Sequence, residues 1–344
     1  MVPLVGRAEG HENVDGEKFN AGEMIIEHII DAHDWHVIGD FSIPLPIILI
    51  DEGELHLFMS SKFHHGHDSY NSKGVEYKIA TEKEYKGKIV RVIPGTMHVD
   101  TEASVPLDLS ITKNVASLIL SLIFLTWLFL SVAKTYAKRK GHAPKGIQSW
   151  LEPLILFIRD DIAKAAIGEK KYKKFTPFLL TIFFFIFFNN LLGLVPFFPG
   201  GVNLTGSITI TMVLALFTFV ITTFSGNKSY WTHIFNAPGV PWWLKLPIPL
   251  MPVVEVIGVI TKPFVLMVRL FANITAGHII ALGFLSLIFI FGEINVGLGM
   301  GVSVVSIAFM VFMTMLELLV AFIQAYVFTL LSAIYFGMAV EEHH

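Results

Sequence analysis

Apolar residues are gathered into five long stretches in the last two thirds of the chain. The first three, at 114–133, 176–195 and 208–224, are each about long enough to cross a hydrocarbon core of about 30 Å as a helix. The last two, at 250–291 and 302–338, are each about 40 residues long, or about 60 Å as helix. Since this is about twice the length of an upright crossing, we expect these two helices to bend or to lie steeply tilted.

The first 112 residues follow a different pattern. Short runs of strand-like composition, at 41–50, 55–60 and 88–93, are interrupted by Gly and Pro. We therefore expect two domains, residues 1–112 and residues 113–344. The fold class is then an all-α polytopic membrane protein with about five membrane helices, the last two forming an antiparallel hairpin, preceded by a small extracytoplasmic domain with some β structure.

A histidine cluster in the first region could be drawn as a metal site. It consists of His64, His65, His67 and Asp68. We favour a solvated loop, because no spacing in the sequence supports a metal-ligand geometry. We therefore assign no metal and no cofactor to the chain.

The composition agrees with a membrane protein. Hydrophobic residues make up 53% of the 344 residues, charged residues only 15%, and the mean hydropathy is +0.64. A soluble protein of this size is not so apolar. The absence of cysteine excludes disulfides and thiolate chemistry, and the net charge of −3 gives no indication of a nucleic-acid partner.

Basic residues in the loops predict the orientation in the membrane. Eleven Lys and Arg residues lie between positions 134 and 174, whereas the 20 residues before the first apolar stretch contain only Lys113. Because Lys and Arg accumulate in cytoplasmic loops, we expect the N-terminal domain outside and the C-terminus in the cytoplasm. Residues 147–174 mix apolar and charged positions, which predicts an amphipathic helix on the cytoplasmic face.

Arg269 lies in the middle of the apolar run 265–272 (VLMVRLFA). A charge at the centre of a membrane helix costs about 2.5–3.5 kcal/mol on insertion scales, and arginine cannot avoid this cost by losing its proton. The alternative is a side chain that reaches the membrane surface from a helix end. The apolar residues that follow Arg269 argue against that alternative, so we interpret it as functional.

Other ionisable residues recur with helical spacing in the same stretch. Glu255, Lys262 and Arg269 are seven residues apart, which places them on one slowly rotating stripe. Asn273, four residues after Arg269, extends that face. His278 is nine residues after Arg269 and points to roughly the opposite side.

The last stretch adds Glu317 and Gln324, again seven residues apart. If the two long helices are antiparallel neighbours, His278 pairs in depth with Glu317 and Arg269 with Gln324, because the midpoints of both pairs fall inside the Gly-rich turn at 292–301. The sequence therefore predicts two polar levels, one nearer the outside than the other.

Each level has a chemical interpretation. His278 and Glu317 can relay protons from the outer side, since a histidine titrates near neutral pH; the alternative is an ion pair that fixes helix packing. Glu255 can belong to a second path that ends in the cytoplasm, or it can be an interfacial carboxylate at a helix end. We expect Lys262 to reach the surface or to pair with a neighbour. Two dead-ended paths separated by Arg269 require a moving carboxylate on a partner.

Several segments resemble one family, subunit a of the F-type ATP synthase, the membrane stator that faces the rotating c-ring. The resemblance covers about residues 113–344. It rests on residues 261–277 (TKPFVLMVRLFANITAG), Gln324 with residues 335–344 (YFGMAVEEHH), residues 188–196 (FNNLLGLVP) and residues 202–212 (VNLTGSITITM). Residues 1–112 match nothing that we can use.

The resemblance implies roles for the polar residues. Arg269 corresponds to the essential arginine that separates two half-channels, and Glu255 to a carboxylate of the cytoplasmic half-channel. His278 and Glu317 fall at positions that family members fill with a Glu and His pair in either order. Asn273 and Gln324 correspond to polar residues near the arginine. The implied partners are the c-ring, the subunit b stalk, the remaining synthase subunits and membrane lipid; the isolated chain would be no enzyme.

Two other classes of function are weaker interpretations. A self-contained ion channel or secondary proton or sodium transporter should show internal repeats or interrupted helices in paired halves, and the sequence shows neither. An intramembrane hydrolase would need a motif such as HExxH, which is absent from the sequence, as is a phosphate-binding Gly-rich loop.

Overall fold

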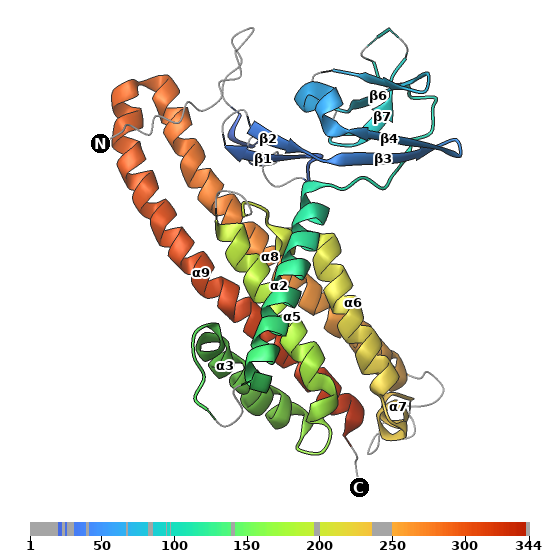
Figure 1. Ribbon diagram of the computed structural model, residues 1–344, viewed down its shortest axis with the longest axis vertical. Helices are drawn as coiled ribbons and strands as arrows, with labels where there is room; N and C mark the ends of the chain where they lie inside the picture. Colours follow the sequence, from blue (N-terminus) through green and yellow to red (C-terminus); the bar gives the residue numbers. More distant parts are fainter. Residues whose placement is uncertain are drawn as a thin grey trace. The chain divides into compact units, whose positions relative to one another are not determined.

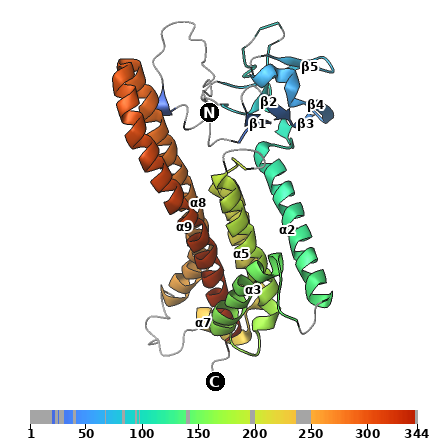
Figure 2. The ribbon, with the colours of Figure 1, turned by 60° about the vertical axis from the view of Figure 1, so that its left-hand side comes forward.

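A computed structural model shows the chain as two compact units (Figures 1 and 2). It describes residues 20–22, 25, 31–38, 41–66, 68–81, 85–93, 95–96, 98–138, 142–195, 200–235 and 250–341. The first unit comprises Met1–Leu120, Val195–Val202 and Leu285–Val304, and the second comprises Ser121–Leu194, Asn203–Phe284 and Val305–His344.

Antiparallel strands form the N-terminal part of the first unit. They make three small sheets, with the orders β1–β2, β4–β3–β8 and β5–β6–β7. Their bounds are Asp34–Ile38 (β1), Phe41–Pro44 (β2), Pro46–Asp51 (β3), Glu54–Met59 (β4), Tyr70–Ser72 (β5), Val75–Ile79 (β6), Ile89–Arg91 (β7) and Leu107–Asp108 (β8). The three predicted strand runs are confirmed, the first of them as two strands, β2 and β3, whereas β1, β5, β6 and β8 were missed because polar residues interrupt them.

One apolar cluster joins the two three-stranded sheets. Ile47 and Leu49 of β3 pack with Phe63, Tyr77 and Ile89, and all five side chains are almost completely buried. Successive side chains of a strand point to opposite faces, so Ile47 and Leu49 enter this core while their neighbours point outward.

Part of the histidine cluster lies outside the described residues. Residues Ser60–Gly66 form a 3-10 helix (η1) in which His64 is exposed, while the side chain of His65 and the whole of His67 lie outside the described residues. Within the part of the chain that the structure describes, no group of three or more His, Asp or Glu side chains is placed to hold a metal ion.

Five helices among the described residues are long and apolar enough to cross a membrane. They confirm the five predicted stretches, and each reaches a few residues further at one or both ends. Their bounds are Lys113–Lys138 (α2), Tyr172–Leu194 (α5), Ile208–Ser225 (α6), Leu250–Ile294 (α8) and Val296–Val340 (α9). A short helix, Lys228–Phe235 (α7), follows α6.

The Gly-rich turn is shorter than predicted. Helix α8 continues to Ile294 and α9 begins at Val296, so Asn295 alone separates them. The Asn295 side chain accepts a hydrogen bond from the Gly297 amide (2.7 Å), which caps α9. Gly299 serves close packing instead of the turn, because a Cβ there would lie 2.7 Å from the Gly292 Cα.

The amphipathic segment also ends earlier than predicted. Helix α3 (Ile147–Phe157) continues through a π-helical segment η2 (Ile158–Lys164) into α4 (Ala165–Ile167). Gly168, at a positive φ of 91°, ends it, and from Tyr172 the chain already belongs to α5. A positive φ is readily adopted only by glycine, which explains the stop.

Helices α8 and α9 are antiparallel neighbours in the second unit (Figures 1 and 2). The Phe284 and Phe309 rings stack with centroids 5.0 Å apart. At the far end of α9, the Lys171 ammonium and the Asn227 amide both donate to the Val340 carbonyl, at 2.8 and 3.0 Å. These bonds satisfy a carbonyl at the helix terminus and anchor α9 to its neighbours.

Candidate functional site

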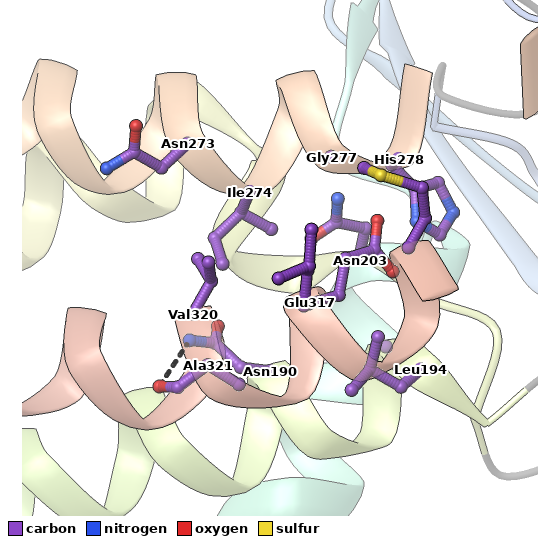
Figure 3. Close-up of a pocket in the computed structure, with 13 residues that line it drawn as sticks. Asn190, Leu194, Asn203, Asn273, Ile274, Gly277, His278, Glu317, Val320 and Ala321 are labelled. Carbon is purple, nitrogen blue, oxygen red and sulfur yellow. Dashed lines mark hydrogen bonds between the residues drawn. The ribbon is translucent and has the colours of Figure 1, made fainter. Parts of the chain in front are cut away.

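A cavity of about 170 Å³ lies between α5, α8 and α9 and beside the 3-10 turn η3 (Leu204–Gly206). Most of its lining is apolar, and its polar side chains come from all of these elements. They are Asn190, Asn203, Asn273, His278 and Glu317. Figure 3 shows Asn203, His278 and Glu317 gathered in one part of the cavity, while Asn273 lies further along α8.

Glu317 approaches α8 very closely. A Cβ added to Gly277 would lie 2.8 Å from the Glu317 Oε1 atom and 3.2 Å from its Cγ atom, so the carboxyl group occupies the space that glycine leaves. Oε1 is buried and accepts no hydrogen bond from any residue that the structure describes. This oxygen is free to accept a hydrogen bond or a proton from a group that enters the cavity.

The structure places His278 and Glu317 at one level. Both line the same cavity, and the contact of Glu317 with Gly277, the residue before His278, sets the register of the two helices. The prediction of equal depth is therefore confirmed. His278 is half-buried, on the side of α8 that faces the cavity.

Asn190 and η3 hold this cavity together. The Asn190 amide donates to the Ala321 carbonyl of α9 (3.2 Å), and its oxygen accepts a hydrogen bond from the Thr205 hydroxyl. The Thr275 hydroxyl of α8 donates to the Gly206 carbonyl (3.2 Å). The turn η3 thus links α5 to α8, and Asn190 links α5 to α9. In the sequence these segments stand out only through the family resemblance, which gave them no role.

Arg269 lies outside the cavity. Its side chain is exposed on α8, where the adjoining Val265 and Val268 are exposed as well. Among the residues that the structure describes, it forms no hydrogen bond or ion pair, and so none with Gln324, which is buried in α9. Asn273, one turn further along α8, is exposed on the same face and also lines the cavity.

A second set of polar side chains lies toward the N-terminal end of α8. The Lys262 ammonium lies 5.7 Å from the centre of the Tyr335 ring, and both side chains line a small cavity with Tyr230 of α7. Burial raises the pKa of Tyr230, and the negative charge of Glu255 raises it further. Arg269 interacts electrostatically with Tyr335. The expectation that Lys262 pairs with a neighbour is met by Tyr335.

Neither tyrosine could be recognised from the sequence. A phenol is not costly in a membrane helix, so nothing in the sequence distinguished Tyr335 from the other aromatic residues near it. Tyr230 lies in α7, outside the five apolar stretches.

Comparison with known proteins identifies the family. The family described as "ATP synthase A chain" matches residues 115–337, which is more than half of the chain. The chain belongs to this family. Its relatives include ATP synthase subunit a of Chloroherpeton thalassium, 44% identical over 69% of both chains. ATP synthase subunit a of Myxococcus xanthus is 43% identical, over 69% of this chain and 75% of its own.

The family membership agrees with the membrane helices. The family and the helices together identify the chain as an integral membrane subunit of the ATP synthase, which works with the other subunits of that complex. They also support a role in proton translocation by the membrane part of the complex. A second family, described as a domain of unknown function, matches residues 24–109. The relative from Chlorobaculum tepidum, ATP synthase subunit a 2, is 43% identical over 71% of this chain and 67% of its own.

Proposed function

We propose that the chain moves protons along two offset paths separated by Arg269, and exchanges them with carboxylates on the rotating c-ring. The observation that carries this proposal is the separation of the polar groups along α8. His278 and Glu317 face a cavity, whereas Arg269 is exposed on an apolar face of the helix. A proton that reaches the cavity therefore needs a carrier from another chain to pass the arginine.

The outer path leads through the cavity of His278 and Glu317. Glu317 offers an oxygen without a hydrogen-bond partner among the described residues, and the imidazole lines the same space. A carboxyl group and an imidazole within one cavity can take up and pass on a proton near neutral pH. Asn273 lies between this cavity and the Arg269 face, where it can orient the arriving carboxylate.

The inner path begins at Glu255. The carboxylate acts electrostatically on Tyr230, and Tyr230 lines a small cavity with Lys262 and Tyr335. The Lys262 ammonium lies over the Tyr335 ring, so a cation–π contact occupies it and it need not take part in proton transfer. This arrangement favours Glu255 over Lys262 as the group that releases protons on the cytoplasmic side.

Arg269 acts as a fixed charge between the two paths. A c-ring carboxylate beside the guanidinium is held in its ionised form, whereas in lipid it must be protonated, so protonation and rotation are coupled. Gln324 supports this region from α9. Each proton that descends 100 mV supplies about 2.3 kcal/mol, which turns the ring and drives ATP synthesis elsewhere in the complex.

The same proposal sets the topology. Residues 1–112 form an extracytoplasmic domain, residues 113–344 form the translocating domain, and the C-terminus lies in the cytoplasm of a bacterial inner membrane. The basic loops support this orientation. The partners are the c-ring, the subunit b stalk and the surrounding lipid, and nucleotide chemistry takes place on other subunits.

The first test compares two basic residues of α8. We expect Arg269→Ala to abolish ATP-driven proton pumping in inverted membrane vesicles, because the charge that separates the paths is lost. The matched control, Lys262→Ala, removes a positive charge two turns away and should retain most of the activity. Comparable losses in the two variants would contradict the roles proposed here.

A second measurement excludes the self-contained channel or transporter. The purified chain, reconstituted into liposomes without the c-ring, should pass no protons when a potential is applied. A proton flux through the chain alone would refute the proposal, because each path would then have to continue past Arg269 without a carrier.

A further inference from the structure

The N-terminal domain exposes an apolar face on the sheet β4–β3–β8. We define this apolar sheet face by its residues, which are Ile48, Ile50, Leu55, Leu57, Met59, Leu107 and Leu109. In the strand register Ile50 lies between Leu55 and Leu107, and paired residues point to the same side of a sheet. The three strands therefore present one continuous surface.

This surface is unusual for a domain in water. Leu57 is 64% exposed and Leu107 is 59% exposed, as much as Trp127 of the membrane helix α2 at 59%. The defining residues include no polar or charged side chain. Soluble proteins rarely expose contiguous apolar patches of this kind unless the patch binds a membrane or a partner.

The chain itself ties the sheet to the start of a membrane helix. Leu109 continues β8 by donating its amide to the Ile48 carbonyl (2.9 Å), and Ile111 donates to Pro46 (3.1 Å). Helix α2 begins only two residues later, where the Lys113 amide donates to the Ala32 carbonyl (2.8 Å). The distance between the sheet and the first turn of the membrane helix is thus set by hydrogen bonds instead of a loose linker.

The side to which the face points is also set. The core of Ile47, Leu49 and Tyr77 lies between the two three-stranded sheets, so the apolar sheet face is directed away from β5–β6–β7. In both views β3 and β4 lie between β5–β6–β7 and the start of α2 (Figures 1 and 2). The face therefore points to the side from which α2 enters the bilayer.

We propose that the apolar sheet face lies in the leaflet of the bilayer at which α2 begins. There it would be immersed at the boundary between headgroups and acyl chains. Burial in lipid removes apolar surface from water, and α2 holds the sheet at the depth this requires. The domain then acts as a monotopic anchor beside the membrane helices. This inference does not depend on the proton paths.

The test uses the absence of cysteine from the chain. Leu57→Cys and Leu107→Cys are made separately, and each places one nitroxide label on the apolar sheet face, on β4 and on β8 respectively. Both variants are studied in the assembled synthase, held in phospholipid nanodiscs. Lys88→Cys, at an exposed position before β7, is the water-facing control, and Trp127→Cys is the lipid-facing one. Collision of each label with oxygen, which concentrates in lipid, is compared with collision with a water-soluble nickel chelate.

We expect the labels at Leu57 and Leu107 to show an oxygen-to-chelate collision ratio several-fold above that at Lys88, approaching the ratio at Trp127. A ratio equal to that at Lys88 would overturn the proposal, because the face would then lie in water. Shielding from both reagents would overturn it as well, since another protein subunit would then cover the face.

Discussion

Gly277→Ala tests the close contact between α8 and Glu317, in the cavity of His278 and Glu317, with a change of one methyl group. The new Cβ would lie 2.8 Å from the Glu317 Oε1 atom, and ordinary contact begins at 3.4 Å, so the carboxyl group must move by about 0.6 Å (3.4 Å minus 2.8 Å). The oxygen is the end of a flexible side chain and can move without unfolding the hairpin. The Cγ atom, 3.2 Å away, must also shift by a few tenths of an ångström.

The expected effect falls on transport and leaves stability almost unchanged. Overpacking costs about 1–3 kcal/mol, and the low end applies here because the displaced oxygen ends a flexible side chain. Alanine favours a helix over glycine by about 1 kcal/mol, so the two effects largely cancel. A misplacement of about 1 Å in a reacting group can cost about 100-fold in rate. For the smaller shift of Glu317 we expect coupled proton transport to fall about tenfold.

Gly258→Ala is the matched control. It makes the same change in the same helix, and nothing lies within 4 Å of its new Cβ. ATP-driven acidification of inverted vesicles measures transport, and the amount of subunit in the membrane measures assembly. If Gly277→Ala transports protons as fast as Gly258→Ala at equal assembly, the position of the Glu317 carboxyl group is not important for the outer path.

Two further predictions concern the scaffold. Asn190→Ala removes the hydrogen bonds that join α5 to α9 and to η3. We expect the complex to lose about 1–3 kcal/mol of stability, measured as a lower temperature of thermal inactivation in detergent. The separate hydrogen bond that Asn203 accepts from the Gly206 amide should remain. A gain in stability would contradict this. In the N-terminal domain, burial alone would raise the pKa of Asp51, but hydrogen bonds from Arg91 and Tyr77 outweigh burial and hold this pKa below its ordinary value. A carboxylate with a depressed pKa stabilises the folded state above its unfolded pKa, and this contribution is lost as the pH falls. The protection factors of the amides in β3 and β7, which are exchange rates corrected for the intrinsic effect of pH, should therefore fall below about pH 4, and they should depend less on pH in Asp51→Asn; equal pH dependence would refute the assignment.

For the hairpin of α8 and α9, part of the structure could be predicted from the sequence. The lengths of the apolar stretches and the spacing of His278, Glu317 and Arg269 are properties of position along the chain, and a helix converts them directly into depth. The common level of His278 and Glu317 could therefore be predicted. The turn was predicted too long, because the glycines at 292–301 were interpreted as loop residues, whereas they lie within the two helices and Gly299 permits close packing against Gly292.

The site could be predicted only in part. Ionisable residues in apolar stretches are conspicuous because each one is costly there. Sequence context does not distinguish the other residues of the site. Asn190 and Tyr335 lie in membrane helices but are uncharged, and Tyr230 lies outside the apolar stretches. Only the packing of separate helices brings Asn190 to the outer cavity and the two tyrosines to Lys262 and Glu255.

The sequence by itself determined the class of protein, the number of membrane helices, the common level of His278 and Glu317 and the resemblance to a family that the comparisons then confirmed. Tertiary structure decided which sides those residues face. Arg269 could point into the bundle or out of it, and β3 (PIILID) is apolar on both faces, so its alternation could not show which face is the core. Position along one element follows from periodicity, but the direction of a side chain depends on which other elements pack against it, and these come from distant parts of the chain.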